Sequence, residues 1–163
     1  MSTLTLRWRR LLPNHSETCP RCSATERHLN RAVDLLKRAL SPLGVSVRVY
    51  KEALSLEEFR RNPLESNRLW IQERPLEEWI GARVGESECC DICAPEACRT
   101  IVWGGIAYSE IPTELILRAG LLAAAHLFGT APAEPEPTGA EACCPAETFC
   151  CSEEPQECCP VRC

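Results

Sequence analysis

Thirteen cysteines constrain this 163-residue chain more than any other feature of its sequence. Small secreted proteins use that many cysteines as a disulfide framework, but they are usually shorter and have an even cysteine count. The N-terminal MSTLTLRWRR also lacks the apolar segment and small-residue cleavage site of a secretory signal. We therefore expect a soluble cytoplasmic protein with mostly reduced thiols, which points to metal or redox chemistry.

Charge and hydropathy disfavour two classes of partner. The net charge of −5 is uneven: residues 130–163 carry seven acidic residues and one arginine, or −6, which leaves +1 for residues 1–129. Nucleic-acid binding needs a net basic face, which a neutral body and an acidic tail do not supply. No apolar run reaches the roughly 18–20 residues that span a bilayer. The sequence therefore predicts neither a nucleic-acid nor a membrane partner.

The acidic segment 130–163 differs in composition from the rest of the chain. It contains six prolines and seven cysteines, with Phe149 and Val161 as its only large apolar side chains. So little apolar surface cannot offset the entropy lost on ordering the segment. We expect residues 1–129 to form one domain, with a cysteine-rich insertion at 86–98, and residues 130–163 to form a disordered tail.

The pattern of apolar residues in the first 129 positions predicts alternating strands and helices. Residues 3–8 and 45–50 alternate apolar and polar, as in half-buried strands, and residues 69–71 form a short buried strand. Helical spacing predicts a helix from Pro20 to about Leu40, with Thr18 or Cys19 as its N-cap. The remaining predicted elements are short helices at 56–61 and 76–80, a β-hairpin of 99–103 and 106–109 around Gly104-Gly105, and a helix from Pro112 to about Phe128. The last helix is apolar nearly all round, so we expect it to be buried on every side.

This order of elements, with Cys19-Pro20-Arg21-Cys22 opening the first helix, resembles the thioredoxin fold. The motifs CPRCSATERHLNRAVDLL, PLESNRLWIQERPLEEWIG, CCDICAPEACRT and IPTELILRAGLLAAA resemble, more narrowly, an uncharacterised bacterial family of thioredoxin-like domains of unknown function, over roughly residues 3–128. The resemblance implies an α/β thioredoxin-like fold, with a central mixed sheet and flanking helices, and implies no activity. Thioredoxins place a cis-proline just before the third strand, where this chain reads Glu65-Ser66-Asn67. This departure disfavours ordinary disulfide exchange and favours metal capture beside the CxxC motif.

The first cysteine group is Cys19 and Cys22, at the start of the first predicted helix. Free N–H groups and the helix dipole stabilise a thiolate at such a position, and Arg21 adds a positive charge nearby. Cys19 is therefore the expected low-pKa nucleophile, and Cys22 the resolving thiol or a second metal ligand.

The second group has the spacing C-C-x2-C-x4-C and comprises Cys89, Cys90, Cys93 and Cys98. Cysteines three apart can bind one metal ion, because the turn between them is tight. Cys90 and Cys93 joined to Cys19 and Cys22 would form a four-thiolate set like that of zinc ribbons, and four thiolates could also hold an iron–sulfur cluster. A structural disulfide within the insertion is the alternative, although adjacent cysteines rarely bridge each other.

The third group lies in the tail and comprises three adjacent pairs and a final cysteine: Cys143, Cys144, Cys150, Cys151, Cys158, Cys159 and Cys163. Soft thiolates favour Cu(I), Zn(II) and thiophilic ions such as Hg(II) or As(III). A flexible chain imposes no single geometry on such ions, and the nearby glutamates attract cations. The composition is therefore that of a metallothionein-like segment.

Three functions are compatible with these thiol groups. The leading hypothesis is sequestration or transfer of soft metal or metalloid ions (mercury, arsenic, zinc or copper), as in metal detoxification, with a metal-transfer or thiol-reducing protein as partner. The alternative is an enzyme, a thiol–disulfide oxidoreductase or metalloid reductase, in which Cys19 attacks and Cys22 resolves. In the third, the first two groups hold a permanent structural zinc ion or iron–sulfur cluster. Turnover with a dithiol reductant distinguishes the enzyme from the two binding proteins.

Overall fold

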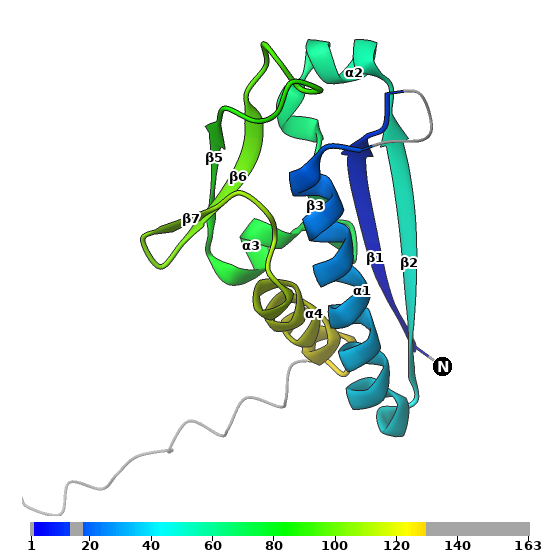
Figure 1. Cartoon of the computed structure of the whole chain (residues 1–163). Coiled ribbons are helices and arrows are strands. Elements are labelled where there is room, and N and C mark those ends of the chain that lie inside the picture. Colours follow the sequence, from blue (N-terminus) through cyan, green and yellow to red (C-terminus); the bar gives the residue numbers. More distant parts are fainter. Residues whose placement is uncertain (1, 14–17, 130–163) are drawn as a thin grey trace, which may run out of the picture. The chain divides into compact units, whose positions relative to one another are not determined.

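The computed structural model describes residues 2–13 and 18–129. In this part of the chain a four-stranded mixed sheet, a three-stranded antiparallel sheet and four α-helices contribute to one core (Figure 1). The predicted α/β class, with a mixed sheet and flanking helices, is confirmed. The tail predicted at residues 130–163 lies outside the described residues.

The elements follow the chain in the predicted order, with small differences at their ends. The strands are β1 (Ser2–Leu11), β2 (Val45–Leu54), β3 (Arg68–Ile71), β4 (Arg74–Pro75), β5 (Arg83–Ser87), β6 (Cys98–Trp103) and β7 (Ile106–Tyr108). The helices are α1 (Pro20–Leu40), α2 (Leu56–Arg61), α3 (Leu76–Ile80) and α4 (Thr113–Leu127), with short 3-10 turns η1 (Ser41–Leu43) and η2 (Pro63–Glu65). The sequence predicts all of these strands and α-helices except β4 and β5.

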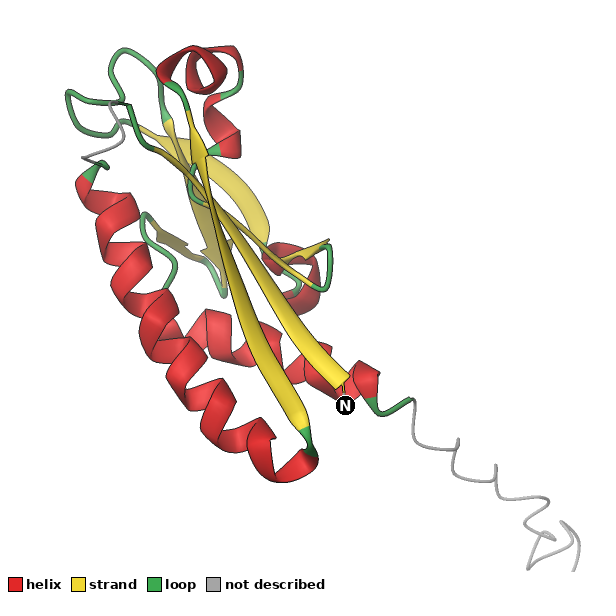
Figure 2. Cartoon of the chain, turned by 90° about the vertical axis from the view of Figure 1, so that its right-hand side faces the viewer, coloured by secondary structure: helices red, strands yellow, loops and turns green. Residues whose placement is uncertain are grey.

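The larger sheet has the strand order β2-β1-β3-β4. β1 pairs in parallel with β2, from Ser2 opposite Val45 to Leu11 opposite Leu54, and β3 lies antiparallel on the other side of β1. Parallel pairing of consecutive strands requires a long crossover connection, which α1 provides (Figure 2). β1 and β2 therefore run in the same direction, with α1 between them in the sequence.

The core forms where alternate residues of β1 meet the helices. Leu4, Leu6 and Trp8 are fully buried, as is Leu36 of α1. Gly120 of α4 lies so close to α1 that a Cβ atom at this position would be 2.7 Å from Cδ1 of Leu36. The absence of a side chain at Gly120 allows α1 and α4 to approach each other.

The intervening residues of β1 point to the opposite side of the sheet, because side chains alternate along a strand. There the guanidinium groups of Arg7, Arg9 and Arg68 lie 4.1, 5.1 and 4.7 Å from the centroid of the Trp70 ring. Arg9 also pairs with Glu52 at 2.9 Å and with a second carboxylate at 2.7 Å. The arginines cover Trp70, which is only 7% exposed, and carboxylates neutralise part of their charge.

The smaller sheet has the order β5-β6-β7. Its β6–β7 hairpin confirms the predicted turn, since Gly104 and Gly105 both have positive φ, 59° and 81°. The hairpin does not join the larger sheet; it pairs instead with β5, which the sequence does not predict. β5 is mostly polar, and its single large apolar side chain, Val84, is 39% exposed, so it lacks the apolar alternation by which strands are recognised.

The prediction that α4 is buried on every side is wrong. Residues such as Ile116 and Ala123 are fully buried, but Leu121 and Leu122 are 43% and 40% exposed, and Phe128 just after the helix is 55% exposed. The helix packs on α1 and α3 with one side only, so part of its apolar surface faces solvent. None of the helices in the described part of the chain is both long and apolar enough to cross a bilayer.

Candidate metal centre

Four cysteine thiols meet at one place in the fold. The Sγ atoms of Cys19, Cys89, Cys93 and Cys98, hereafter the four-thiol cluster, all lie within 4.8 Å of one another. Three of the side chains are buried and that of Cys89 is half-buried. Two cysteine groups that are distant in sequence therefore form one potential ligand set.

Cys19 is placed by the start of α1. It is the N-cap residue, with extended backbone (φ −65°, ψ 156°), and its Sγ accepts a hydrogen bond from the N–H of Cys22 at 3.5 Å. The preceding residue, Thr18, donates its hydroxyl to the carbonyl of Leu11 at 2.8 Å, which ties the helix start to the end of β1. The predicted cap and first-turn proline are therefore confirmed, and the cap is the thiol itself.

The other three thiols come from the β5–β6 hairpin. Ser87 pairs with Cys98, which brings the two ends of the connecting loop 88–97 together. Within the loop the N–H groups of Cys93 and Ala94 both donate to the carbonyl of Cys90, at 2.9 and 3.1 Å. This is one turn of helical type, in which side chains four residues apart lie on the same side. Cys89 and Cys93 have that spacing, and both join the cluster.

Arg21 attaches this loop to α1. Its guanidinium group donates to the hydroxyl of Ser87 at 2.8 Å and to the carbonyl of Glu88. Glu88, which directly precedes Cys89, is thus anchored to Arg21, which lies two positions after Cys19. The guanidinium group of Arg21 therefore lies against the backbone of the residue before Cys89.

Two predicted ligands lie beside the cluster but outside it. Cys22 is buried, and its Sγ lies 3.7 Å from the hydroxyl of Ser66, which in turn accepts the N–H of Leu11. Cys90 is half-buried on the loop. The set Cys19, Cys22, Cys90 and Cys93 expected from the CxxC spacings is therefore not the one that the fold brings together. The seven cysteines predicted as ligands after residue 130 lie outside the described residues.

The thiols influence one another's protonation. Hydrogen bonds from Cys22, Cys93 and Cys98 hold the pKa of Cys19 well below its usual value, against the effect of burial. The same contacts to Cys19 raise the pKa of Cys22, Cys93 and Cys98, and burial raises that of Cys89. These shifts favour loss of the proton from Cys19 before the other three thiols of the cluster.

The cluster has the dimensions of a tetrahedral thiolate site. Metal–sulfur bonds of about 2.3 Å in a tetrahedron place the sulfur atoms about 3.8 Å apart. The Sγ atoms of Cys19 and Cys89 are 3.9 Å apart, and the 4.8 Å limit holds for every pair in the cluster. Only small side-chain adjustments would bring the four sulfurs to bonding distance of one ion, so the residues fit a soft metal.

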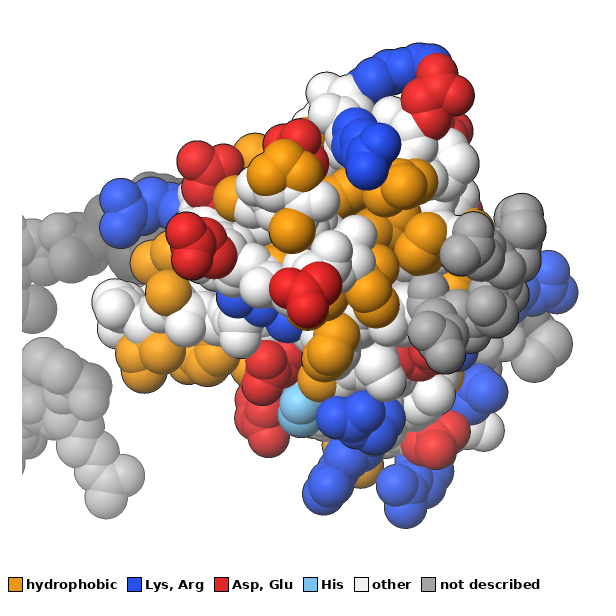
Figure 3. Space-filling view, turned by 45° about the horizontal axis from the view of Figure 1, so that its top comes forward, with side chains coloured by type: hydrophobic (Ala, Val, Ile, Leu, Met, Phe, Trp, Pro, Cys, Tyr) orange, Lys and Arg blue, Asp and Glu red, His pale blue; other side chains and the backbone are white. Residues whose placement is uncertain are grey.

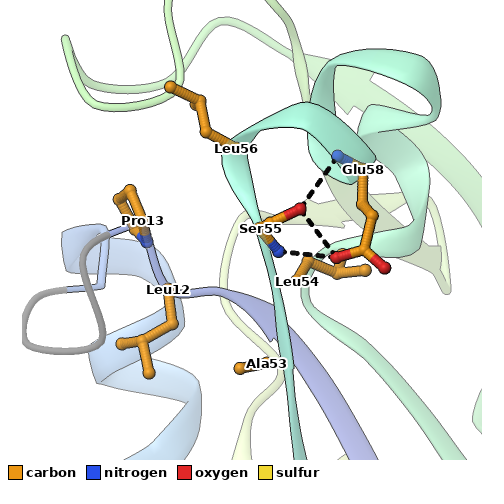
Figure 4. Close-up of a pocket in the computed structure, with 7 residues that line it drawn as sticks. All are labelled: Leu12, Pro13, Ala53, Leu54, Ser55, Leu56 and Glu58. Atoms are coloured by element: carbon orange, nitrogen blue, oxygen red, sulfur yellow. Dashed lines mark hydrogen bonds between the residues drawn. The ribbon is translucent and has the colours of Figure 1, made fainter.

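A separate pocket lies between the end of β1 and the start of α2, lined by Leu12, Pro13, Ala53, Leu54, Ser55, Leu56 and Glu58 (Figure 4). Its polar groups are already engaged. The N–H and hydroxyl of Ser55 both donate to the carboxylate of Glu58 at 2.8 Å, and the N–H of Glu58 donates to the Ser55 hydroxyl. This capping box stabilises α2 and leaves the pocket without a free reactive group.

Comparison with known proteins places the chain in a family. Residues 4–120 match the family described as "Domain of unknown function (DUF2703)". The chain belongs to this family. The DUF2703 segment contains all four residues of the four-thiol cluster. An uncharacterized protein from Archaeoglobus fulgidus is 47% identical over 98 residues, which are 60% of this chain and 71% of the relative. No solved structure matches the chain.

Proposed function

We propose that this protein binds one soft metal or metalloid ion with Cys19, Cys89, Cys93 and Cys98, for sequestration or transfer in the cytoplasm. The observation that carries the proposal is the convergence of four Sγ atoms to within 4.8 Å from two separate elements. Apolar side chains would fill this part of the core at least as well as four thiols. Thiolate ligation of an ion explains why all four residues are cysteines. The ion is of the mercury, arsenic, zinc or copper class.

The tail extends this function in the proposal. Its seven cysteines and seven acidic residues supply further soft ligands and a negative field for cations. The composition of the tail predicts a flexible segment, which would accept ions of different preferred geometry, whereas the four-thiol cluster would impose a tetrahedral one. The tail would raise the number of ions bound per chain, and the cluster would select among them.

The proposal includes a thioredoxin-like placement of the domain. The β1–α1–β2 crossover and the position of the Cys19-Pro20-Arg21-Cys22 motif at the start of α1 support it. Ser66 and Asn67 precede β3 in the structure, and Ser66 contacts Cys22 where thioredoxins have the cis-proline. A small polar residue in that place leaves the thiols free for a metal ion.

The second candidate function is thiol–disulfide exchange by Cys19 and Cys22. It is favoured by the hydrogen bond from the Cys22 N–H to the Cys19 sulfur and by the lowered pKa of Cys19. Cys19 would attack a substrate disulfide, release one substrate thiol and form a mixed disulfide with the other. Cys22 would then attack the mixed disulfide, release the second substrate thiol and leave a Cys19–Cys22 disulfide. Both thiols are only 1% exposed, however, and an exchange thiol has to be reached by its substrate. Burial therefore favours ion binding over exchange.

Native mass spectrometry after anaerobic purification tests the proposal. The full-length chain, and a full-length variant with the seven tail cysteines changed to serine, are loaded with Cd²⁺ and with As(III). We expect the variant to retain one ion and the unaltered chain to bind more. A metal-free protein with a Cys19–Cys22 disulfide and catalytic turnover with a dithiol reductant would instead establish the oxidoreductase.

A further inference from the structure

A second pocket is formed by the loop that carries Cys89 of the four-thiol cluster. Its lining comprises seven residues of the β5–β6 loop: Glu88, Cys89, Cys90, Asp91, Ala94, Pro95 and Glu96. We refer to it as the loop pocket. One wall is Cys89, which belongs to the cluster. The loop pocket is thus in direct continuity with the proposed ion site.

The cluster is accessible from this side. Cys19 and Cys93 are 1% exposed and Cys98 is 4% exposed, so the core covers three of the four sulfurs. Cys89 is half-buried, and the adjacent Cys90 is half-buried in the same pocket. An ion that reaches or leaves the three buried thiols by this route meets Cys90 and Cys89 first.

The loop pocket also carries negative charge. Glu88, Asp91 and Glu96 line it, and its lining contains no basic side chain. None of these three carboxylates forms an ion pair or side-chain hydrogen bond with another residue in the described part of the chain. On the face that Figure 3 displays, separate acidic side chains (red) lie beside side chains of the orange class, which includes cysteine, and basic side chains (blue) lie around them. Unpaired carboxylates at the mouth of a site raise the local concentration of cations.

We propose that the loop pocket is the port through which the ion enters and leaves the four-thiol cluster, and that Cys90 is the thiol that transfers it. This inference rests on the proposed function, because it concerns the same ion and the same site. Cys90 lies outside the cluster yet next to its most accessible ligand, so it can take the place of Cys89 while the three buried thiolates hold the ion. The recipient on the outer side is a thiol-bearing acceptor.

Transfer is a ligand exchange without oxidation or reduction. Cys90 loses its proton to solvent as its sulfur bonds to the ion, and the bond from the ion to Cys89 breaks. The Cys89 thiolate then takes a proton. Acceptor thiols then displace Cys90 and the three buried thiolates in the same way, each acceptor losing a proton as it bonds to the ion and each displaced thiolate taking one, until the ion has left the chain. The reverse order carries the ion inward.

The test uses Cd²⁺ and the full-length chain in which the seven tail cysteines are serine, so that only the described thiols bind. Native mass spectrometry gives the number of ions per chain, and its repetition at timed intervals after addition of excess dithiothreitol gives the rate of transfer. We expect Cys90→Ser to keep one ion per chain and to transfer it about tenfold more slowly. Equal transfer rates with and without Cys90 would overturn its role in ion transfer. Absence of bound Cd²⁺ in the chain that has serines in the tail and still has Cys90 would overturn the proposed function itself.

Neutral substitution of the carboxylates tests the port. In the triple variant Glu88→Gln, Asp91→Asn and Glu96→Gln, we expect Cd²⁺ uptake to be about tenfold slower at low ionic strength, and the difference to shrink as salt is added. A matched control removes three exposed charges elsewhere, with Asp34→Asn, Glu57→Gln and Glu114→Gln. Equal slowing in the control would show that net charge alone matters and would overturn the port.

Discussion

The Sγ atoms of Cys89 and Cys19 lie 3.9 Å apart although 70 positions separate the two residues along the chain. The helix start that carries Cys19 and the loop that carries Cys89 are joined through Arg21, which bonds to Ser87 and Glu88. This contact assembles ligands from two elements, and it leads to predictions about the ion, the thiols and the domain that supports them.

Cys93→Ser should lower the affinity for Cd²⁺ by more than about 100-fold, because loss of a ligand exceeds the 10–100-fold effect of losing a group that only orients one. Cys22→Ser is the matched control, since Cys22 is equally buried but lies outside the four-thiol cluster. Competition with a chelator in the variant with serines in the tail gives both affinities. Equal losses in the two variants would mean that the cluster is not the ligand set.

Loading the cluster with a divalent ion at neutral pH should release about three protons, because metal binding displaces the protons of its ligands. The pKa of Cys19 is lowered, whereas the pKa values of Cys89, Cys93 and Cys98 are raised, so we expect only Cys19 to be a thiolate before the ion binds. Affinity should therefore rise with pH. Calorimetry in buffers of different ionisation enthalpy counts the protons; release of about four would contradict a thiolate at Cys19.

Arg21→Gln should weaken Cd²⁺ binding by roughly tenfold, as expected for loss of a group that orients ligands. The substitution removes the contacts that anchor the loop to α1 and the positive charge of the guanidinium group. Arg27→Gln is the control, because within the described residues the Arg27 side chain bonds only to Ser23 of its own helix. Chelator competition measures both variants. Unchanged affinity in Arg21→Gln would show that the hairpin alone holds the loop in place.

Glu77→Gln should lower the free energy of unfolding by about 3–5 kcal/mol, because it leaves a buried charge without its partner. Glu77 pairs with Arg99, which is 5% exposed and whose pKa burial lowers; Arg99 also donates to the carbonyl of Leu64. Glu78→Gln is the matched neighbour, since it pairs with Arg74 at the surface and should cost less than about 1 kcal/mol. Urea unfolding of the metal-free protein compares the two. Similar small costs would mean that the buried pair adds no net stability.

Sequence reasoning succeeded for several features that depend on residues close together in the chain. Helical spacing, the Cys19 cap with Pro20 behind it, and the two positive-φ glycines of the hairpin are local, so they could be read directly. It failed at β5 because that strand is mostly polar and forms by pairing with β6, which follows it after a ten-residue loop. It also failed at the outer side of α4, whose apolar side chains give no indication of how many neighbours cover them.

The choice of ligands was decided by tertiary structure. Spacing alone favoured Cys22 and Cys90, since both belong to pairs three residues apart. The turn at Cys90, the pairing of Ser87 with Cys98, and the bonds from Arg21 instead bring Cys89 and Cys98 to Cys19. Side-chain direction in a loop depends on its hydrogen bonds and on the element it contacts. The sequence therefore identifies the chemistry of the site, and the three-dimensional fold determines which thiols can share an ion.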